Sequence, residues 1–273
     1  MSLCTNIIGL VSDYSNCINY KLLNKEIYNE VNNFESFNYW KEKYNKFLSN
    51  LKLEKIILKG NYKWKYEYMR VIEFNEWQYI YDNINSSSLY IQFKLIKLPK
   101  EIGNLINLQI LSLHDNKIKE IPKEIYSLIN LRELRITNNE IKEIPKEIEN
   151  LINLQKLNLY SNKIKKIPKE IGNLINLQNF CINNNEVKEI PNEIGNLINL
   201  QKLLLSYNKI KKIPKQIGNL VNLNTLWLNN NKIKKIPKQI GNLANLKALY
   251  LNNNKIMRIP KEIGNLANLN LFR

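Results

Sequence analysis

The sequence has little cysteine, histidine, proline or glycine, and no long apolar run. Its 273 residues include three cysteines, one histidine, eight prolines and eight glycines. Cys4, Cys17 and Cys181 are scattered and odd in number, which favours neither a disulfide framework nor a zinc site of the CxxC kind. No run approaches the ~20 apolar residues that cross a bilayer, and the first residues lack the cationic start of a secretion signal. We therefore expect reduced thiols and an intracellular, cytoplasmic protein, with the nucleus left open.

Residues for acid–base or metal chemistry are equally scarce. The one histidine, His114, has Asp115 beside it. The chain offers no nucleophile elbow, no phosphate-cradling glycine loop and no metal-ligand spacing. We expect a non-enzymatic protein without catalytic residues, metal or cofactor, in which His114 is a surface side chain.

Negative charge is also in short supply. Forty-one Lys and Arg stand against 24 Asp and Glu, which gives a formal net charge of +17. Such a balance attracts nucleic acid, anionic lipid or acidic proteins at low salt, and it does not by itself choose among them. The chain is 44% hydrophobic, enough to build a core in one or two domains.

What the sequence does contain is a repeat with a period of 23 residues. Seven full copies run from residue 105, and a degenerate copy precedes them at about 89–104. All eight prolines fall at one position of the repeat, and an asparagine recurs at another. A fixed period of this length is typical of a solenoid. The leucines that open successive copies are Leu105, Leu128, Leu151, Leu174, Leu197, Leu220, Leu243 and Leu266.

The pattern within each copy predicts its local structure. Leu157 and Leu159 have the two-residue period of a short strand with one buried face, and stacked copies would form a parallel sheet. The recurrent asparagine, such as Asn162, is placed to bridge backbone groups of neighbouring copies. Proline fixes φ and donates no hydrogen bond, so an irregular or one-turn helical arc should begin there. Because Tyr126 and Glu149 replace a glycine found in other copies, we expect no obligatory positive φ at that position.

The unit written from Leu151, LINLQKLNLYSNKIKKIPKEIGN, resembles the intracellular IxxIPxxIxxL type of the leucine-rich repeat family. The resemblance covers residues 105–273. It implies an α/β fold: a horseshoe-shaped leucine-rich repeat solenoid with a parallel sheet on its concave face. We expect this solenoid to occupy residues 89–273 and a small helical domain to occupy residues 1–88.

Positions that differ between copies are free to contact a partner, and in a solenoid they line the concave face. Leu204, Tyr207, Trp227 and Tyr250 fall in adjacent copies, which predicts an exposed aromatic patch of the kind that anchors protein interfaces. Lysines gather in the stretch after each strand. Without interleaved aromatics we expect a solvated face there and disfavour nucleic acid as a partner. The predicted partner-binding residues are Arg135, Asn158, Tyr160, Leu204, Tyr207, Trp227 and Tyr250.

Residues 1–88 form a different module, with no proline and three of the four tryptophans. Helical spacing of apolar residues predicts a small bundle. The stretch Leu22-Leu23-Asn24-Lys25 with Tyr28 resembles the L-V-N-K-x-x-Y segment of an F-box, and Trp40-Lys41 resembles the W-K that follows it. Cys4 replaces the usual proline, and the stretch between Tyr14 and Leu23 is short. The resemblance implies that a Skp-type adaptor would bind Leu3, Ile7, Ile8, Val11, Leu22, Leu23 and Tyr28.

Three hypotheses for function follow. The first is a substrate-recognition adaptor of an F-box/cullin-RING ubiquitin ligase, which would bind its target protein on the concave face. The second is a plain leucine-rich repeat scaffold whose helical part only caps the first strand. The third is a binder of nucleic acid or an anionic surface through the lysines. We expect a monomer, and the sequence leaves the identity of the bound protein open.

Overall fold

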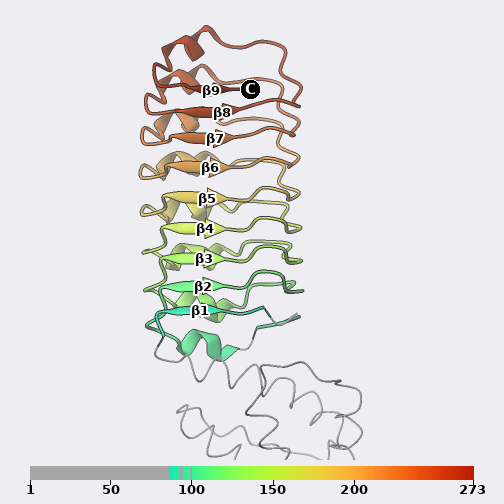
Figure 1. The fold of residues 1–273 in the computed structure, drawn as a ribbon, viewed down its shortest axis with the longest axis vertical. Helices are drawn as coiled ribbons and strands as arrows, with labels where there is room; N and C mark the ends of the chain where they lie inside the picture. Colours follow the sequence, from blue (N-terminus) through green and yellow to red (C-terminus); the bar gives the residue numbers. More distant parts are fainter. Residues whose placement is uncertain (1–85, 93–94, 99) are drawn as a thin grey trace, which may run out of the picture. The chain divides into compact units, whose positions relative to one another are not determined.

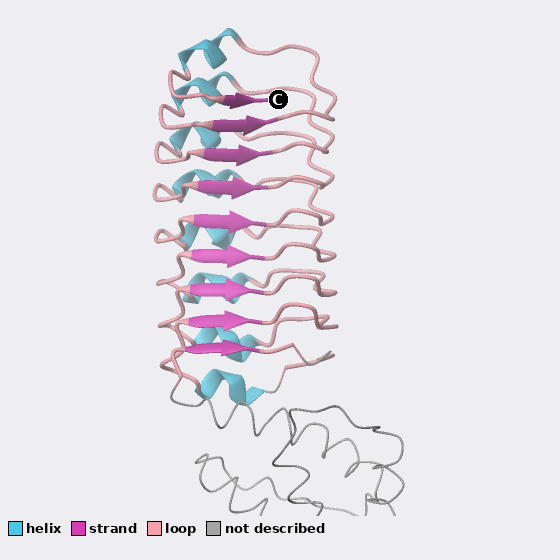
Figure 2. Ribbon diagram, viewed as in Figure 1, coloured by secondary structure: helices cyan, strands magenta, loops and turns pink. Residues whose placement is uncertain are grey.

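The structure is a computed structural model that describes residues 86–92, 95–98 and 100–273. These residues form a regular stack of units, each with one strand and one short 3₁₀ helix (Figure 1). The strands lie on one side of the stack and the helices lie on the other (Figure 2). The predicted solenoid is therefore confirmed. The predicted helical bundle and the seven predicted adaptor-binding residues, Leu3 to Tyr28, lie outside the described residues.

Within the described residues, nine strands form one parallel sheet in chain order. The register does not slip, so that Leu111, Leu134 and Leu157 pair in one file across three strands. The 23-residue period produces this file because each copy places the same residue at the same height. The strands are β1 (Ser88–Tyr90), β2 (Ile110–Ser112), β3 (Glu133–Arg135), β4 (Lys156–Asn158), β5 (Asn179–Cys181), β6 (Lys202–Leu204), β7 (Thr225–Trp227), β8 (Ala248–Tyr250) and β9 (Leu271–Phe272).

A 3₁₀ helix of five residues follows each of the first eight strands. The proline of the repeat is the N-cap residue of seven of these helices, as in Pro122, which has a φ of −65°. Its carbonyl accepts a hydrogen bond from the Ile125 amide at 3.1 Å, so the missing proline N–H leaves the turn intact. The helices are η1 (Lys100–Asn104), η2 (Lys123–Ser127), η3 (Lys146–Asn150), η4 (Lys169–Asn173), η5 (Asn192–Asn196), η6 (Lys215–Asn219), η7 (Lys238–Asn242) and η8 (Lys261–Asn265).

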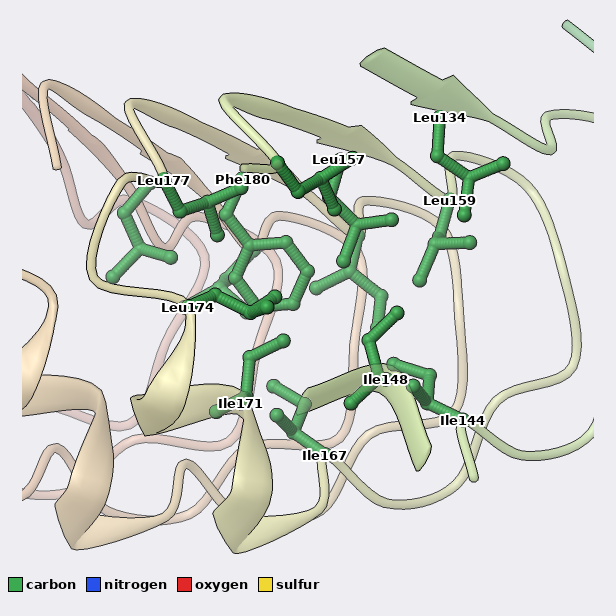
Figure 3. Close-up of a cluster of buried hydrophobic side chains, with 14 of the residues drawn as sticks. Leu134, Ile144, Ile148, Leu157, Leu159, Ile167, Ile171, Leu174, Leu177 and Phe180 are labelled. Atoms are coloured by element: carbon green, nitrogen blue, oxygen red, sulfur yellow. The ribbon is translucent and has the colours of Figure 1, made fainter. Parts of the chain in front are cut away.

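The core lies between the sheet and the helices. Leu157 and Leu159 point into it from the strand side and are at most 1% exposed. Ile148 and Ile171 point into it from the helix side (Figure 3). Phe180 takes the place of a strand leucine and is fully buried. Each unit therefore buries its apolar face against the units above and below it, as expected for a solenoid.

The recurrent asparagine joins successive units, as the sequence predicts. Asn162 is 9% exposed, and its side-chain oxygen accepts a hydrogen bond from the Ile141 amide at 3.0 Å. Its side-chain nitrogen donates to the carbonyls of Ile136 at 2.7 Å and Leu159 at 3.2 Å. The same bridge recurs in the other described units, for example at Asn208. One amide thus satisfies backbone groups that would otherwise be buried without partners.

The glycine found in most copies of the repeat lies close to the next unit, and its backbone angles do not require glycine. Neither Tyr126 nor Glu149, which stand in its place, has a positive φ, so that expectation is confirmed. A Cβ atom at Gly172 would lie 2.6 Å from the Glu193 carbonyl oxygen of the next unit, which is too close for any side chain. Where the buried Tyr126 replaces the glycine, η2 and η3 pack less closely than η4 and η5.

Candidate protein-binding surface

The exposed sheet face, on the side of the strands away from the core, corresponds to the concave face predicted from sequence. Its side chains alternate with the buried leucines along each strand. The register aligns one residue per unit into a file that runs across eight strands at about 4.8 Å per step. This file consists of Tyr90, Ser112, Arg135, Asn158, Cys181, Leu204, Trp227 and Tyr250.

One part of this face is hollowed and rich in aromatic side chains; we call it the aromatic hollow. Its volume is about 630 Å³. The rings of Trp227 and Tyr250 meet edge to face, with their centroids 5.5 Å apart, and the Arg273 guanidinium lies 5.8 Å from the centre of the Tyr250 ring. Tyr160 and Tyr207 are 43% and 59% exposed and bring two further rings. The lining residues are Tyr160, Asn183, Asn184, Ser206, Tyr207, Trp227, Asn229, Tyr250, Asn252 and Arg273.

Of the seven residues predicted to bind a partner, four line the aromatic hollow and three do not. The carboxylate of Glu133, which is 8% exposed, forms an ion pair with Arg135 and lies 3.6 Å from the Lys156 ammonium. The side-chain oxygen of Asn158 accepts a hydrogen bond from the Tyr160 amide at 3.1 Å. Polar groups of Arg135 and Asn158 are therefore already engaged within the fold. Leu204 is half-buried and lies outside the lining.

Tyr207 holds an unusual backbone conformation at the rim of the hollow. Its φ is 55°, in the left-handed region that a bulky side chain rarely adopts. Its amide donates to the Asn229 carbonyl at 3.1 Å, and its carbonyl accepts from the Asn185 amide at 3.1 Å, so bonds to both neighbouring units fix it. The residues at the same position in the other units are small and polar: Asp115, Asn138, Ser161, Asn184, Asn230 and Asn253.

The strain at Tyr207 serves no purpose in the core, because the side chain is mostly exposed. The repeat imposes this φ in every full unit, so what is unusual is the bulky side chain, and strained residues of this kind gather at functional sites. Sequence analysis selected Tyr207 for its aromatic ring and did not foresee the positive φ. The available signal was the run of Asn and Asp at this offset, since these residues tolerate the left-handed region best.

A second hollow, of about 700 Å³, lies along the amide side chains that precede the strands, and it is less suited to binding. Asn130, Asn153 and Asn176 line it. Each of them donates a hydrogen bond at 2.9 Å to a carbonyl of the preceding unit. These amides hold adjacent units together, so their presence is explained by the stack itself.

The geometry around His114 does not resemble a catalytic triad. The Ser112 hydroxyl lies 3.2 Å from the imidazole Nδ1, but Ser112 is only 2% exposed. The Asp115 carboxylate accepts hydrogen bonds from Gln92 at 3.1 Å and Asn138 at 2.7 Å, so these bonds tie it to neighbouring units. Within residues 86–92, 95–98 and 100–273, no group of three His, Cys, Asp or Glu side chains is placed to hold a metal ion.

Two other properties of the described residues bear on function. Burial raises the pKa of the Cys181 thiol, which lies in the file next to Leu204, so this cysteine is held in its unreactive protonated form. Among the described residues, no helix is long and apolar enough to cross a membrane.

Comparison with protein families assigns the fold to a known class. The family model described as a leucine-rich repeat region matches residues 88–157, 123–206 and 192–273, which together span more than half of the chain. The chain therefore belongs to the leucine-rich repeat family. A search of curated proteins gave no match.

Several solved structures share the fold. A leucine-rich repeat protein of Leptospira interrogans is 46% identical over 64% of this chain and 45% of its own, with a TM-score of 0.62. The ectodomain of the Arabidopsis thaliana receptor kinase GASSHO1/SCHENGEN3 is 32% identical over 64% of this chain and 22% of its own, with a TM-score of 0.62. An internalin, inlF, of Listeria monocytogenes is 31% identical over 66% and 51%, with a TM-score of 0.59. The chain thus spans about half or less of each of these structures.

Proposed function

We propose that this chain is a non-enzymatic, intracellular protein-binding module whose aromatic hollow holds an extended segment of a partner protein. Leucine-rich repeat proteins act as protein-interaction scaffolds, and this role fits the family to which the chain belongs. We number the units from the first full copy, so that residues 105–127 are unit one. The observation that carries the proposal is the gathering of four aromatic side chains, from units three, five, six and seven, in one exposed hollow.

The chemistry of the hollow favours a peptide. Exposed Tyr and Trp side chains supply a large contact area at low entropic cost and dominate the energetics of protein interfaces. Asn252 lies among the rings, where its side-chain amide can pair with the backbone of an extended chain. The side-chain oxygens of Asn183 and Asn229, by contrast, already accept hydrogen bonds from the amide and the hydroxyl of Ser206. The related ectodomain of GASSHO1/SCHENGEN3 was solved in complex with CASPARIAN STRIP INTEGRITY FACTOR 2, which supports a binding role for the repeats.

Random peptides displayed on phage and selected against the full chain would test the proposal. We expect selected peptides to bind the wild type, and Trp227→Ala with Tyr250→Ala to weaken that binding by roughly 30-fold or more, the effect of losing an interface hot spot. Tyr90→Ala is the matched control, because Tyr90 is an exposed tyrosine of the same face on β1, outside the hollow. Equal binding by both variants would show that the hollow is not the site.

The finer proposal, a ubiquitin-ligase adaptor, rests on the sequence of the first module alone. The stretch from Leu22 to Tyr28 that resembles an F-box lies outside the described residues, and the plain scaffold fits the repeats equally well. Capture of a purified Skp-type adaptor by the full chain, abolished by Leu22→Ala with Leu23→Ala, is the expected result. Ile152→Ala, at an exposed position of the repeats, is the control. Failure to capture the adaptor would leave the scaffold as the function.

A further inference from the structure

Positive charge is concentrated in one part of the stack. Residues 194–261 contain thirteen Lys and Arg residues and no Asp or Glu. Eleven of these cations, all exposed, lie between the exit of a strand and the start of the next 3₁₀ helix in units five to seven; we call this set the basic arc. It consists of Lys209, Lys211, Lys212, Lys215, Lys232, Lys234, Lys235, Lys238, Lys255, Arg258 and Lys261.

At two of the four repeat positions of the basic arc, those of Lys209 and Lys212, other units carry glutamate, so folding does not explain the absence of acid there. Glu120, Glu143 and Glu189 occupy in other units the position that Lys212 and Lys235 occupy in the basic arc. Each of these glutamates is exposed, as the lysines are. The exchange therefore changes charge without changing a buried contact.

Acid is also missing from two of the three helices that begin in the basic arc. Helices η2 to η5 and η8 have a glutamate in the first turn, whereas η6 and η7 have none, because Gln216 and Gln239 stand in its place. An acidic residue near a helix N-terminus is normally favourable. The side-chain oxygen of Gln216 is buried without a hydrogen-bond partner, so it gains the fold no bond. What Gln216 and Gln239 have in common is that neither carries the negative charge of the glutamate found at this position in the other units.

Two lysines of the stack, one outside the basic arc and one at its edge, are neutralised by the preceding unit. The Lys163 ammonium lies 3.1 Å from a carboxylate oxygen of Glu140, and the Lys209 ammonium lies 2.7 Å from a carboxylate oxygen of Glu186. These hydrogen bonds lower the pKa of both carboxyl groups. Beyond Lys209, no member of the basic arc forms an ion pair with another described residue. Cations stacked at about 5 Å repel one another, and a bound polyanion would relieve that repulsion.

The residue types of the basic arc favour a lipid surface over nucleic acid. Ten of its eleven cations are lysines, and no aromatic residue stands between them in residues 209–215, 232–238 and 255–261, so the basic arc lacks the aromatic side chains that stack on bases. Met257 occupies the position of a lysine in the other units and is 89% exposed between Lys255 and Arg258. An apolar side chain among lysines suits the interface of a bilayer, where fluid anionic lipids can adjust to fixed cations. We propose that the basic arc binds an anionic lipid bilayer surface, independently of the aromatic hollow.

Vesicle co-sedimentation of the full chain tests this proposal. The vesicles would be phosphatidylcholine alone, or phosphatidylcholine with about one third phosphatidylserine, a typical anionic lipid. We expect binding only to the anionic vesicles, decreasing steeply with added salt. One lysine near such a surface is worth roughly a five-fold change in partition coefficient. Lys212→Gln with Lys235→Gln should therefore weaken binding about 30-fold, and Lys212→Glu with Lys235→Glu should weaken it more.

The matched control is Lys117→Glu with Lys166→Glu, which changes the net charge of the chain equally. These lysines lie in units one and three, at positions that hold glutamate in other units, as in Glu140 and Glu143. We expect the control to retain binding within about three-fold, since its sites lie roughly a Debye length from the basic arc. Thermal unfolding would verify that both variants fold.

Three outcomes would overturn the proposal. Equal loss in the control and the basic-arc variant would mean that binding follows net charge. Equal binding to both kinds of vesicle would mean that anionic lipid is not recognised. Tight binding of a short DNA duplex that depends on Lys212 and Lys235, without vesicle binding, would assign the basic arc to nucleic acid. None of these results bears on peptide binding in the hollow, so the two proposals fail separately.

Discussion

Replacing Tyr207 with asparagine separates a role in folding from a role in binding. Tyr207 is 59% exposed and has a φ of 55°. Asparagine tolerates that conformation better, which relieves roughly 1 kcal/mol of backbone strain. The covered part of the ring is the opposing term. The covered remainder of a side chain of about 200 Å² is roughly 80 Å², which is worth at most about 2 kcal/mol at about 25 cal/mol per Å², and asparagine keeps part of that contact. We therefore expect a net change in stability of at most about 1 kcal/mol in Tyr207→Asn.

Thermal unfolding and peptide binding measure the two sides of this prediction. A change of about 1 kcal/mol shifts the midpoint by about 2–4 °C in a protein of this size, so we expect Tyr207→Asn to shift it by at most about 4 °C. Binding of a peptide selected against the wild type should fall by ten-fold or more, because an exposed ring of the aromatic hollow is lost. A fall in stability of more than about 3 kcal/mol with unchanged binding would show that Tyr207 serves the fold, and the reasoning would be refuted.

Three further predictions concern stability, and denaturant unfolding measures each. Asn162→Ala should cost about 3 kcal/mol because it leaves buried backbone groups unpaired, whereas Asn153→Ala, which removes one exposed hydrogen bond, should cost less than about 1 kcal/mol. Gly195→Ala should destabilise by about 1–3 kcal/mol, since the new Cβ atom would lie 2.6 Å from the backbone carbonyl oxygen of Gln216. Gly264→Ala should be neutral or slightly stabilising, because a Cβ atom there would have no neighbouring atom within 4 Å. Tyr126→Phe should stabilise by about 1 kcal/mol, because the Tyr126 hydroxyl is buried without a partner. Equal effects within either pair, or a less stable Tyr126→Phe, would contradict these arguments.

The repeat made the fold predictable because every copy places the same residue types at the same positions. Leu157 and Leu159 predicted a buried strand face, and Asn162 predicted a bridge between units, and both predictions are confirmed. The fold of a solenoid is easier to predict from sequence than most folds, since each unit contacts only its neighbours and the period gives the register directly. Three-dimensional contacts follow from sequence distance, as they do not in most folds.

Features that depend on contact distances were beyond the sequence. The sequence did not show that the helix of the next unit lies close to the Cα atom of Gly172. It did show, through Tyr126 and Glu149, that this position does not require a positive φ. The ion pair of Arg135 with Glu133 also escaped prediction. Alternation placed Arg135 on the exposed face, but a hydrogen bond or ion pair within that face depends on rotamers. Sequence alone therefore located the face, and the prediction that Arg135, Asn158 and Leu204 bind a partner there stays a prediction.

The two proposed surfaces use different positions of the same repeat, which lets them vary independently. Side chains of the aromatic hollow, such as Trp227, project from the strands, whereas those of the basic arc, such as Lys235, follow them by several residues. The leucines and asparagines between these positions fix the backbone, so a change in one surface leaves the other in place. Removing the charge of Lys212 and Lys235 should thus leave peptide affinity unchanged, and Trp227→Ala should leave vesicle binding unchanged. Coupling between the two measurements would show that one ligand spans both surfaces.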